Sequence, residues 1–269
     1  MGSTAARKTL GASRIPAWSP DLPSGGTPRD DHSSPQPVAL YFPSCTTAMF
    51  GPATSDGMGA RVAFETLCER AGIEMRTPEG IADLCCGTPW KSKGLSAGYD
   101  TMKSTVLPRI DQADPTGSVP LVCDASSCAE GLRIMQGHGA SRTVIDAVTF
   151  VHDVVLPLLP TPRKLGRVAV HPTCSSTHLG STDALLELAR HLAHDVYVPP
   201  SWGCCAFAGD RGMLHPELSE SATAIQAAEI VSAGADAHVS SNRTCELGMT
   251  RATGRPYRHV LELLEEATR

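Results

Sequence analysis

The sequence predicts an α/β protein with two pseudo-symmetric lobes, each a small parallel sheet flanked by helices. Two observations lead to this fold class. Short apolar runs alternate with longer helix-like segments from about Val38 to the C-terminus, a pattern typical of parallel sheets with helices on their faces. The same series of cysteine motifs also occurs twice, at a spacing of about 125 residues, which indicates an internal duplication.

Composition and the repeat together predict three regions. Residues 1–36 are rich in Ser, Pro and Gly and show no hydrophobic periodicity. Because such a segment cannot bury enough apolar area to offset its ordering entropy, we predict a flexible N-terminal linker there. The first cysteine-rich lobe then spans residues 37–160 and the second spans residues 161–269, which are ordinary domain sizes.

The first lobe opens with a short apolar run that predicts a buried strand. A segment with helical periodicity follows, in which Val62, Leu67 and Ala71 are among the apolar positions of one face. Two more strands and two more helices complete the lobe. The predicted elements are strand 38–42, helix 57–71, strand 73–76, helix 92–110, strand 119–124 and helix 128–136.

The second lobe repeats this alternation and closes with a final helix. Strands that alternate with helical segments argue for parallel pairing, because each return to the sheet needs a crossover. The predicted elements are strand 167–171, helix 183–194, strand 196–199, helix 217–233, strand 237–240 and helix 257–267.

Eight of the ten cysteines form two matched series, each a single cysteine, an adjacent pair and another single cysteine. The first single cysteine of each series follows the first predicted strand of its half, and the last follows a later strand. Since ligands of open parallel sheets bind beyond the carboxyl ends of the strands, three loops per lobe should bring thiols to one edge. The predicted metal ligands are Cys45, Cys85, Cys86 and Cys128 in the first half and Cys174, Cys204, Cys205 and Cys245 in the second.

Adjacent cysteines suit an iron–sulfur cluster better than a structural zinc site, in which paired thiols usually stand two to four residues apart. Four cysteines per half are enough for one [4Fe–4S] cluster each, so we expect one or two such clusters. Gly87, Gly203 and Gly209 would let the backbone pass close to inorganic sulfide. Zinc remains an alternative because thiolates also select it, and disulfides are a further one.

Overall composition excludes several classes of function. A net charge of −5 with 23 basic residues and 4% aromatic residues argues against nucleic-acid binding. The most apolar stretch, residues 144–160, is interrupted by Asp146, His152 and Asp153, so we expect no transmembrane segment. The N-terminus lacks the pattern of a secretory signal, and we expect a cytoplasmic protein or one at the cytoplasmic face of a membrane.

The stretches around the two cysteine pairs resemble a known family. Residues 84–94 read LCCGTPWKSKG and residues 203–212 read GCCAFAGDRG. They resemble the cysteine-rich CCG domain found in heterodisulfide reductase and in the glycolate oxidase iron–sulfur subunit. The resemblance is strongest to the C-terminal iron–sulfur region of FAD-linked D-lactate dehydrogenases of the cytochrome- or quinone-reducing type. It extends from about Val38 to the C-terminus.

The sequence departs from the fullest family pattern at three positions. That pattern ends in Cys-x-x-Cys, whereas Ala125 and Asn242 stand where a fifth cysteine would lie, which favours four-ligand clusters. Cys123 is a candidate fifth ligand in the first half. Ala206 replaces the glycine that follows the cysteine pair in the first half.

The resemblance implies an iron–sulfur electron-transfer domain or subunit, which relays electrons from a flavin toward a quinone or cytochrome. No flavin-binding domain and no Cys-x-x-Cys-x-x-Cys run is recognisable in the sequence. We therefore expect partners: a FAD-containing dehydrogenase domain or subunit and a ferredoxin-type iron–sulfur domain. The chain should not be catalytically complete alone. Two alternatives stay open, a thiol/disulfide redox catalyst like heterodisulfide reductase and a metal-free docking scaffold.

Several residues near the cysteine motifs have a plainer interpretation. Cys68, within a predicted helix, should be a small buried apolar residue. His171, His178 and His215 could move protons or shape a quinone site, but a hydrogen-bonded structural histidine is the favoured interpretation of each.

Overall fold

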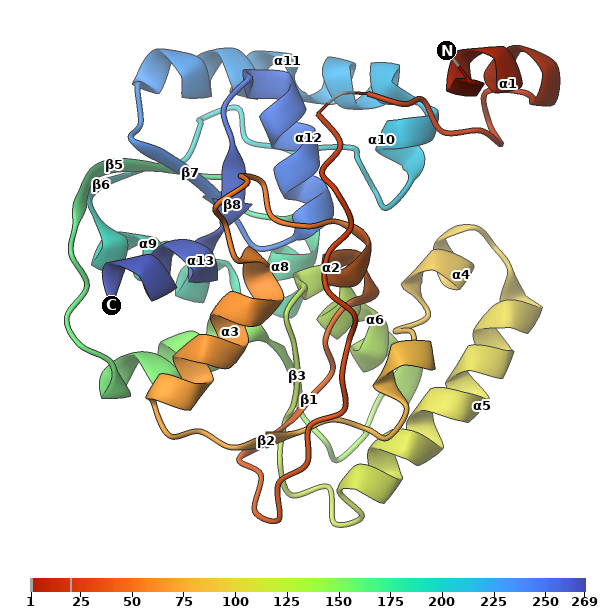
Figure 1. Cartoon of the computed structure of the whole chain (residues 1–269), viewed down its shortest axis with the longest axis vertical. Helices are drawn as coiled ribbons and strands as arrows, with labels where there is room; N and C mark the ends of the chain where they lie inside the picture. The colour runs from red at the N-terminus through yellow and green to blue at the C-terminus, as the bar shows by residue number, and fades with distance from the viewer. Residues whose placement is uncertain (1, 20) are drawn as a thin grey trace.

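The computed structural model describes residues 2–19 and 21–269, and it confirms the predicted α/β class with two lobes. Each lobe holds a four-stranded, all-parallel sheet with helices on its faces (Figure 1). The strand orders are β2-β1-β3-β4 and β6-β5-β7-β8, so the second sheet repeats the topology of the first. The strands are β1 (Ala39–Tyr41), β2 (Met75–Arg76), β3 (Leu121–Cys123), β4 (Val144–Asp146), β5 (Leu165–Val170), β6 (Ala193–Tyr197), β7 (Ala237–Ser240) and β8 (Tyr257–His259).

The helices also follow the same order in both lobes. The first lobe has α2 (Cys45–Met49), α3 (Gly59–Arg70), α4 (Thr88–Ser92), α5 (Ser96–Ala113), α6 (Ser126–Gln136) and α7 (Ala147–Phe150). The second has α8 (Cys174–Leu179), α9 (Thr182–Leu192), α10 (Arg211–Leu214), α11 (Pro216–Ala233), α12 (Arg243–Thr253) and α13 (Val260–Ala267). Short helical turns are η1 (Ile81–Asp83), η2 (Val151–Val155) and η3 (Leu156–Leu158), and α1 (Gly2–Leu10) precedes both lobes.

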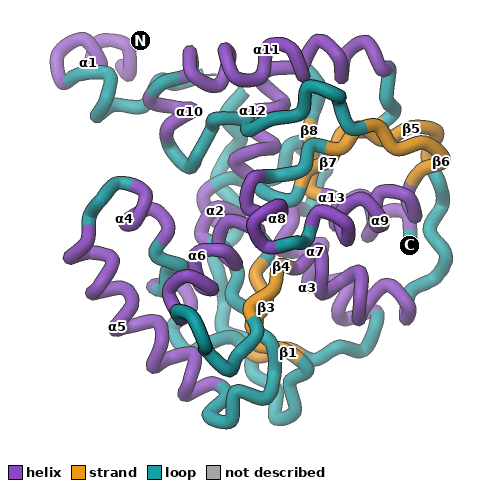
Figure 2. Tube along the Cα trace, turned by 180° about the vertical axis from the view of Figure 1, so that it is seen from behind, coloured by secondary structure: helices purple, strands orange, loops and turns teal. Residues whose placement is uncertain are grey.

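Alternation along the strands creates a shared core and two outer cores. On β1, Ala39 and Tyr41 face the core that both lobes share, while Leu40 faces the outer core of the first lobe. Helices α3, α9 and α13 lie between the two sheets and contribute to the shared core, whereas α5 and α11 cover the far sides (Figure 1). Seen from behind, α5 and α11 again lie at opposite ends of the molecule (Figure 2). The lobes therefore pack together through a common apolar centre.

The carboxyl ends of the two sheets approach one another, and a hydrogen bond joins them. The hydroxyls of Ser126, at the start of α6, and Thr173, just before α8, lie 2.9 Å apart. The backbone N–H of Ser126 also donates to the carbonyl of Ser241 at 3.5 Å. The turns that follow β3, β5 and β7 thus meet between the lobes.

The structure differs from the sequence-based prediction in two strands and several helices. The strands β4 and β8 and the helix α12 are absent from the predicted elements, as are the shorter helices α1, α2, α4, α7, α8 and α10. Residues 257–259, assigned to the final helix, form β8 instead. Both strands lead directly into a helix, β4 into α7 and β8 into α13, so no turn or loop in the sequence separates the strand from the helical segment that follows. None of the described helices is long and apolar enough to cross a membrane.

The segment before the first lobe contacts both lobes. The backbone N–H of Ala17 donates to the carbonyl of Met213 at 2.7 Å, and Asp21 pairs with Arg251 at 2.8 Å. Further on, the N–H of Gly26 donates to the carbonyl of Ala48 in α2 at 2.9 Å. The segment therefore runs from the second lobe to the first. The boundaries at residues 36 and 160 stay predictions.

Candidate metal centres

In the first lobe, three loops bring the four predicted cysteines together. Cys45 is the first residue of α2, directly beyond β1, and Cys128 lies in the first turn of α6, beyond β3. Cys85 and Cys86 lie between η1 and α4. The four thiols are successive neighbours: Cys45 lies beside Cys85, Cys85 lies beside Cys86, and the Sγ atoms of Cys86 and Cys128 are 3.4 Å apart and hydrogen-bonded. Their ligation of a metal stays a prediction.

A buried arginine from the N-terminal segment holds two of these loops. Arg29 is 8% exposed and donates to the carbonyls of Pro43 at 3.0 Å, Ala82 at 2.7 Å and Leu84 at 2.9 Å. The first carbonyl belongs to the loop of the single cysteine, and the other two belong to the loop of the adjacent pair. Sequence reasoning missed Arg29 because it lies in the predicted linker, where no spacing or periodicity marks it.

The turn before the first single cysteine of each lobe, Cys45 or Cys174, is held by a different set of hydrogen bonds in each lobe. In the first lobe, the buried carboxylate of Asp124 accepts hydrogen bonds from the Ser44 N–H at 2.7 Å and from the Tyr41 hydroxyl at 2.9 Å. In the second lobe, Thr173 and Ser176 exchange side-chain and backbone hydrogen bonds as a capping box at the start of α8. Each device fixes the cysteine that begins the next helix.

The environment of the first centre favours one thiolate. Hydrogen bonds from the Cys45 and Cys86 thiols hold the pKa of Cys85 well below its usual range, aided by the Gly87 N–H and the charge of Arg29. The pKa of Cys45 is raised by its hydrogen bond to Cys85 and by burial, and the pKa of Cys86 is raised by its hydrogen bonds and burial. The first site therefore accommodates negative charge before any metal is bound.

The second lobe assembles its four cysteines in the same way. Cys174 begins α8, Cys204 and Cys205 lie between β6 and α10, and Cys245 lies in the first turn of α12. Cys174 neighbours Cys204, Cys204 neighbours Cys205, and the Sγ atoms of Cys205 and Cys245 lie within 4.8 Å of one another. Cys205 and Cys245 are buried, whereas Cys204 is exposed. The duplicated order of the cysteines is thus matched by a duplicated arrangement in space.

The thiols of the second centre have a different protonation pattern. Burial raises the pKa of Cys174 to about 11. The hydrogen bond to Cys205 raises the pKa of Cys204. Cys205 receives a hydrogen bond from Cys204, but its own hydrogen bond to Cys245 and its burial leave its pKa raised. These three thiols are therefore protonated at neutral pH unless a metal displaces the proton.

The residue after each cysteine pair adopts a left-handed backbone conformation. Gly87 has φ +81° and Ala206 has φ +53°. In both lobes this turn directs the N–H of that residue to the first cysteine of the pair: Gly87 donates to Cys85, and Ala206 donates to the Sγ of Cys204 at 3.3 Å. Glycine adopts this conformation freely, whereas alanine does so at a cost of about 1–2 kcal/mol. The feature that the lobes share is the turn, even where the glycine is absent.

His171 is an additional buried polar group at the second centre. One of its ring nitrogens and the Sγ atoms of Cys205 and Cys245 all lie within 4.8 Å of one another. The ring is 1% exposed, and neither nitrogen has a hydrogen-bond partner among the described residues. Burial lowers the pKa of His171 to about 4; the Gln226 amide opposes that lowering but does not reach hydrogen-bond geometry with either nitrogen.

The prediction of hydrogen-bonded structural histidines is therefore confirmed for two residues and wrong for the third. His178 lies 2.7 Å from the carboxylate of Glu130, and His215 lies 3.1 Å from that of Glu217. His171 differs because its strand directs it into the outer core with the thiols, where no described residue reaches hydrogen-bond geometry with either ring nitrogen.

The remaining candidates are also located. Cys123 is fully buried in the outer core of the first lobe with Cys86 and Cys128, and burial raises its pKa. Cys68 is fully buried in the shared core, as predicted. Ala125 and Asn242, which replace the fifth cysteine of the family pattern, precede α6 and α12 as their N-cap residues.

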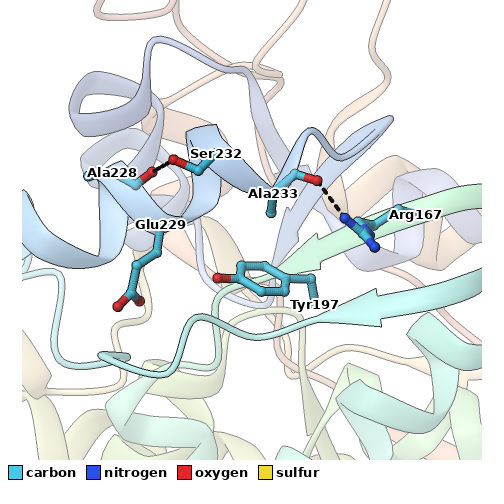
Figure 3. A pocket seen from close by; sticks show the side chains of 6 residues that line it. All are labelled: Arg167, Tyr197, Ala228, Glu229, Ser232 and Ala233. Carbon is cyan, nitrogen blue, oxygen red and sulfur yellow. Dashed lines mark hydrogen bonds between the residues drawn. The ribbon is translucent and has the colours of Figure 1, made fainter.

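A surface pocket lies away from both centres. It has a volume of about 510 Å³ and lies between α11 and the β5–β6 edge of the second sheet (Figure 3). Arg167 donates to the carbonyl of Ala233 there at 2.6 Å. None of the described cysteines lines this pocket, so it does not belong to either thiol cluster. Its lining residues are Arg167, Tyr197, Ala228, Glu229, Ser232 and Ala233.

Comparison with solved structures gives only weak similarity. Glutamate racemase isoform RacE1 from Bacillus anthracis is 11% identical, with 87% of this chain and 80% of that chain covered and a TM-score of 0.34. The aspartate racemase homologue PH1733 from Pyrococcus horikoshii OT3 is also 11% identical, with 85% and 96% covered and a TM-score of 0.34. At this level neither similarity carries a functional argument. A search of curated proteins finds no match.

Comparison with protein families is decisive. The model of the family described as CCG, cysteine-rich domain, matches residues 39–133 and residues 168–250. These two segments contain both cysteine series, and they begin within β1 and β5, the corresponding first strands of the two lobes. The grouped thiols and the family match together indicate a metal-binding or redox role. With two copies of the domain and eight cysteines in two matched clusters, this chain belongs to the CCG cysteine-rich domain family.

Proposed function

We propose that the chain is the iron–sulfur electron-transfer domain or subunit of a FAD-linked dehydrogenase that oxidises D-lactate or a related 2-hydroxy acid. It would pass electrons from the flavin toward a quinone or cytochrome. The observation that supports this proposal is the gathering of four cysteines at the carboxyl edge of each parallel sheet, in matched order. The resemblance of residues 84–94 and 203–212 to such dehydrogenases suggests the substrate class.

The donor set fits iron–sulfur clusters. Four neighbouring thiols per lobe match the ligand number of a [4Fe–4S] cluster, and the low pKa of Cys85 provides thiolate character in the first lobe. In the second lobe, burial raises the pKa of Cys174, so a bound metal would have to displace its proton. Cys45, Cys85, Cys86 and Cys128 would hold one cluster, and Cys174, Cys204, Cys205 and Cys245 the other.

The protein controls the surroundings of such a cluster. When bound, a [4Fe–4S] cluster supplies a one-electron couple whose potential depends on charge, hydrogen bonds and solvent exposure. Burial of Cys86 and Cys205 excludes water from one side of each site. The N–H groups of Gly87 and Ala206 donate to sulfur, and Arg29 places a positive charge beside the first site.

Anaerobic reconstitution of the full chain tests the proposal. The protein should take up iron and acid-labile sulfide in equal amounts and show broad visible absorption from thiolate-to-iron charge transfer. The double variants Cys85→Ser/Cys86→Ser and Cys204→Ser/Cys205→Ser should each retain about half of the iron, since each removes one centre. Cys68→Ser, a change in the shared core, is the matched control and should retain all of it. Colourless protein that binds only zinc would contradict the proposal.

Electron transfer requires a separate measurement. Mixed anaerobically with a FAD-linked D-lactate dehydrogenase domain, the reconstituted chain should lose visible absorption when D-lactate is added. Bleaching that occurs equally without the flavoprotein, or none in its presence, would argue against the proposed electron source.

A thiol/disulfide catalyst is the second candidate, and one observation favours it. Cys85 has a strongly lowered pKa, and a thiolate is the nucleophile in disulfide exchange. The Sγ atoms of Cys86 and Cys128 are 3.4 Å apart, close enough for hydrogen-bonded thiols that could form a disulfide after a small movement. Metal-free protein that reduces a model disulfide, and loses this activity in Cys85→Ser, would support this candidate over the first.

A further inference from the structure

The strand that precedes the second centre directs His171 toward the cysteines. On β5, Val168 and Val170 face the shared core, whereas Ala169 faces the outer core that contains Cys205 and Cys245. Side chains two residues apart on an extended strand point to the same side, so His171 follows Ala169 to the thiol side. The position of the imidazole is therefore set by the sheet.

Backbone hydrogen bonds fix this extension of β5. The His171 N–H donates to the carbonyl of Val239 at 2.9 Å, which continues the parallel pairing with β7. The His171 carbonyl accepts a hydrogen bond from the hydroxyl of Ser240 at 2.8 Å. Both partners belong to β7, so the backbone at His171 keeps its Cα–Cβ bond on the thiol side of the sheet.

The imidazole is buried without a partner. Neither ring nitrogen makes a hydrogen bond with any described residue, although the residue is 1% exposed. An unsatisfied buried polar group is destabilising, because it has lost its hydrogen bonds to water, so the fold retains a destabilising group beside the cysteines. A metal ion removes that cost, because a neutral imidazole nitrogen is a good metal ligand.

The corresponding position of the first lobe holds Phe42. Phe42 is three residues before Cys45, just as His171 is three residues before Cys174. Phe42 lies in the outer core with Leu40 and Cys86, so it occupies the thiol side of β1. Phenylalanine cannot ligate a metal, and the two lobes therefore offer different donor sets.

We propose that His171 is a nitrogen ligand of the metal centre in the second lobe, beside Cys205 and Cys245. This inference rests on the proposed function. The first centre would then be ligated by thiolates alone, and the second by thiolates and one neutral imidazole. Since a [4Fe–4S] cluster takes four protein ligands, the imidazole would stand in for one of the four thiolates that the proposed function assigns to this centre. Such a replacement raises the potential of an iron–sulfur centre, so the second centre would be the better electron acceptor of the pair.

Pulsed electron paramagnetic resonance of the reduced, reconstituted full chain tests the ligation directly. With ¹⁵N-labelled histidine, the spectrum should show the strong nitrogen coupling of a directly bonded imidazole. His171→Phe, which copies the first lobe, should abolish this coupling and lower the midpoint potential of one centre only. His178→Phe is the matched control, since His178 pairs with Glu130 at the surface, and should leave coupling and potentials unchanged.

The possible results separate this inference from the proposed function. Iron-replete wild-type protein without nitrogen coupling overturns the role of His171 and leaves the iron–sulfur proposal intact. If the chain takes up no iron, cobalt(II) titrated into the metal-free protein decides the matter instead. A visible cobalt spectrum that differs between wild type and His171→Phe supports the ligand role, and identical spectra overturn it. The nitrogen coupling is read from the wild-type protein, so that measurement does not depend on the folding of the variant. In the cobalt titration, circular dichroism of metal-free His171→Phe has to match that of the wild type before the spectra are compared.

Discussion

In the first lobe, Arg29 places a permanent positive charge beside Cys45 and Cys85, and Phe42 fills the thiol side of β1. In the second lobe, His171 takes the place of Phe42. Topology, cysteine order and the left-handed turn after the cysteine pair are the same in both. The duplication therefore preserved the scaffold that gathers the thiols, while the groups around the thiols diverged. Two centres in such a pair are expected to differ in potential and in lability.

Among the variants that test the difference between the two lobes, Arg29→Met should have the largest effect on stability and on the iron content of the first centre. The change removes a buried charge and leaves three carbonyls without their donor, which should lower the free energy of unfolding by about 3–4 kcal/mol. Iron should be lost from the first centre and retained in the second. Urea unfolding and iron analysis of the full chain measure both effects.

Arg29→Lys separates the charge from the hydrogen bonds. Lysine keeps the positive charge but lacks the planar guanidinium group that donates to both loops. Compared with Arg29→Met, Arg29→Lys should therefore bring the midpoint potential of the first centre back toward the wild-type value, while the free energy of unfolding recovers less. Equal iron content and equal stability in wild type and Arg29→Met would contradict the role that we assign to Arg29.

The second expected effect is a pH dependence of the free energy of unfolding, which arises at the N-terminal cap of α13 in the second lobe. His259 caps α13 through Nδ1, whereas the corresponding cap of α7 in the first lobe is Asp146. Burial lowers the pKa of His259 to about 4 from 6.5. Below pH 6.5 the His259 imidazole therefore binds a proton in the unfolded chain but not in the folded chain. The free energy of unfolding falls as the pH decreases toward 4. The loss should reach up to about 3 kcal/mol.

His259→Asn tests this pH dependence. Asparagine retains an oxygen acceptor for the cap but does not titrate. The difference in unfolding free energy between wild type and His259→Asn should change in favour of the variant as the pH falls from about 7 to about 4.5. A difference that is constant over this range would show that His259 does not set the acid sensitivity.

A third effect should come from Gly87→Ala. The residue has φ +81°, and a Cβ there would lie 2.7 Å from both Met135 Cε and Tyr99 Cε2. Backbone strain and crowding together should destabilise the protein by about 2 kcal/mol and weaken the first centre. Gly94→Ala is the control, since Gly94 has φ +70° but open space around its Cβ position, and it reports the strain alone.

The smallest effect is expected from the reciprocal change, Ala206→Gly. It relieves the left-handed strain at φ +53° but adds flexibility to the unfolded chain, so stability should rise by only about 0.5 kcal/mol. The N–H of residue 206 should keep its hydrogen bond to Cys204. A loss of stability in this variant would show that the Ala206 methyl group contributes packing that outweighs its strain.

The sequence was sufficient to predict the fold class, because the alternation of elements and the repeated cysteine order are both local patterns. It did not reveal β4 and β8, because each strand runs directly into a helix with no loop between them, and it did not reveal α12, in which few residues are apolar. The eight grouped cysteines were identifiable because their spacing is itself a signal, although their ligation of a metal stays a prediction. The roles of Arg29 and of the buried imidazole of His171 have no such signal, because each arises from tertiary packing against distant segments.

The hydrogen bond between Ser126 and Thr173 has a consequence for electron transfer between the two centres. Ser126 is two residues from Cys128, and Thr173 is the immediate neighbour of Cys174, so one 2.9 Å contact joins a loop of each centre. Tunnelling favours covalent and hydrogen-bonded routes over gaps. An electron that moves between the lobes would cross a few peptide bonds and this buried hydrogen bond, so the contact that joins the two sheets would also be a route for electron transfer between the centres.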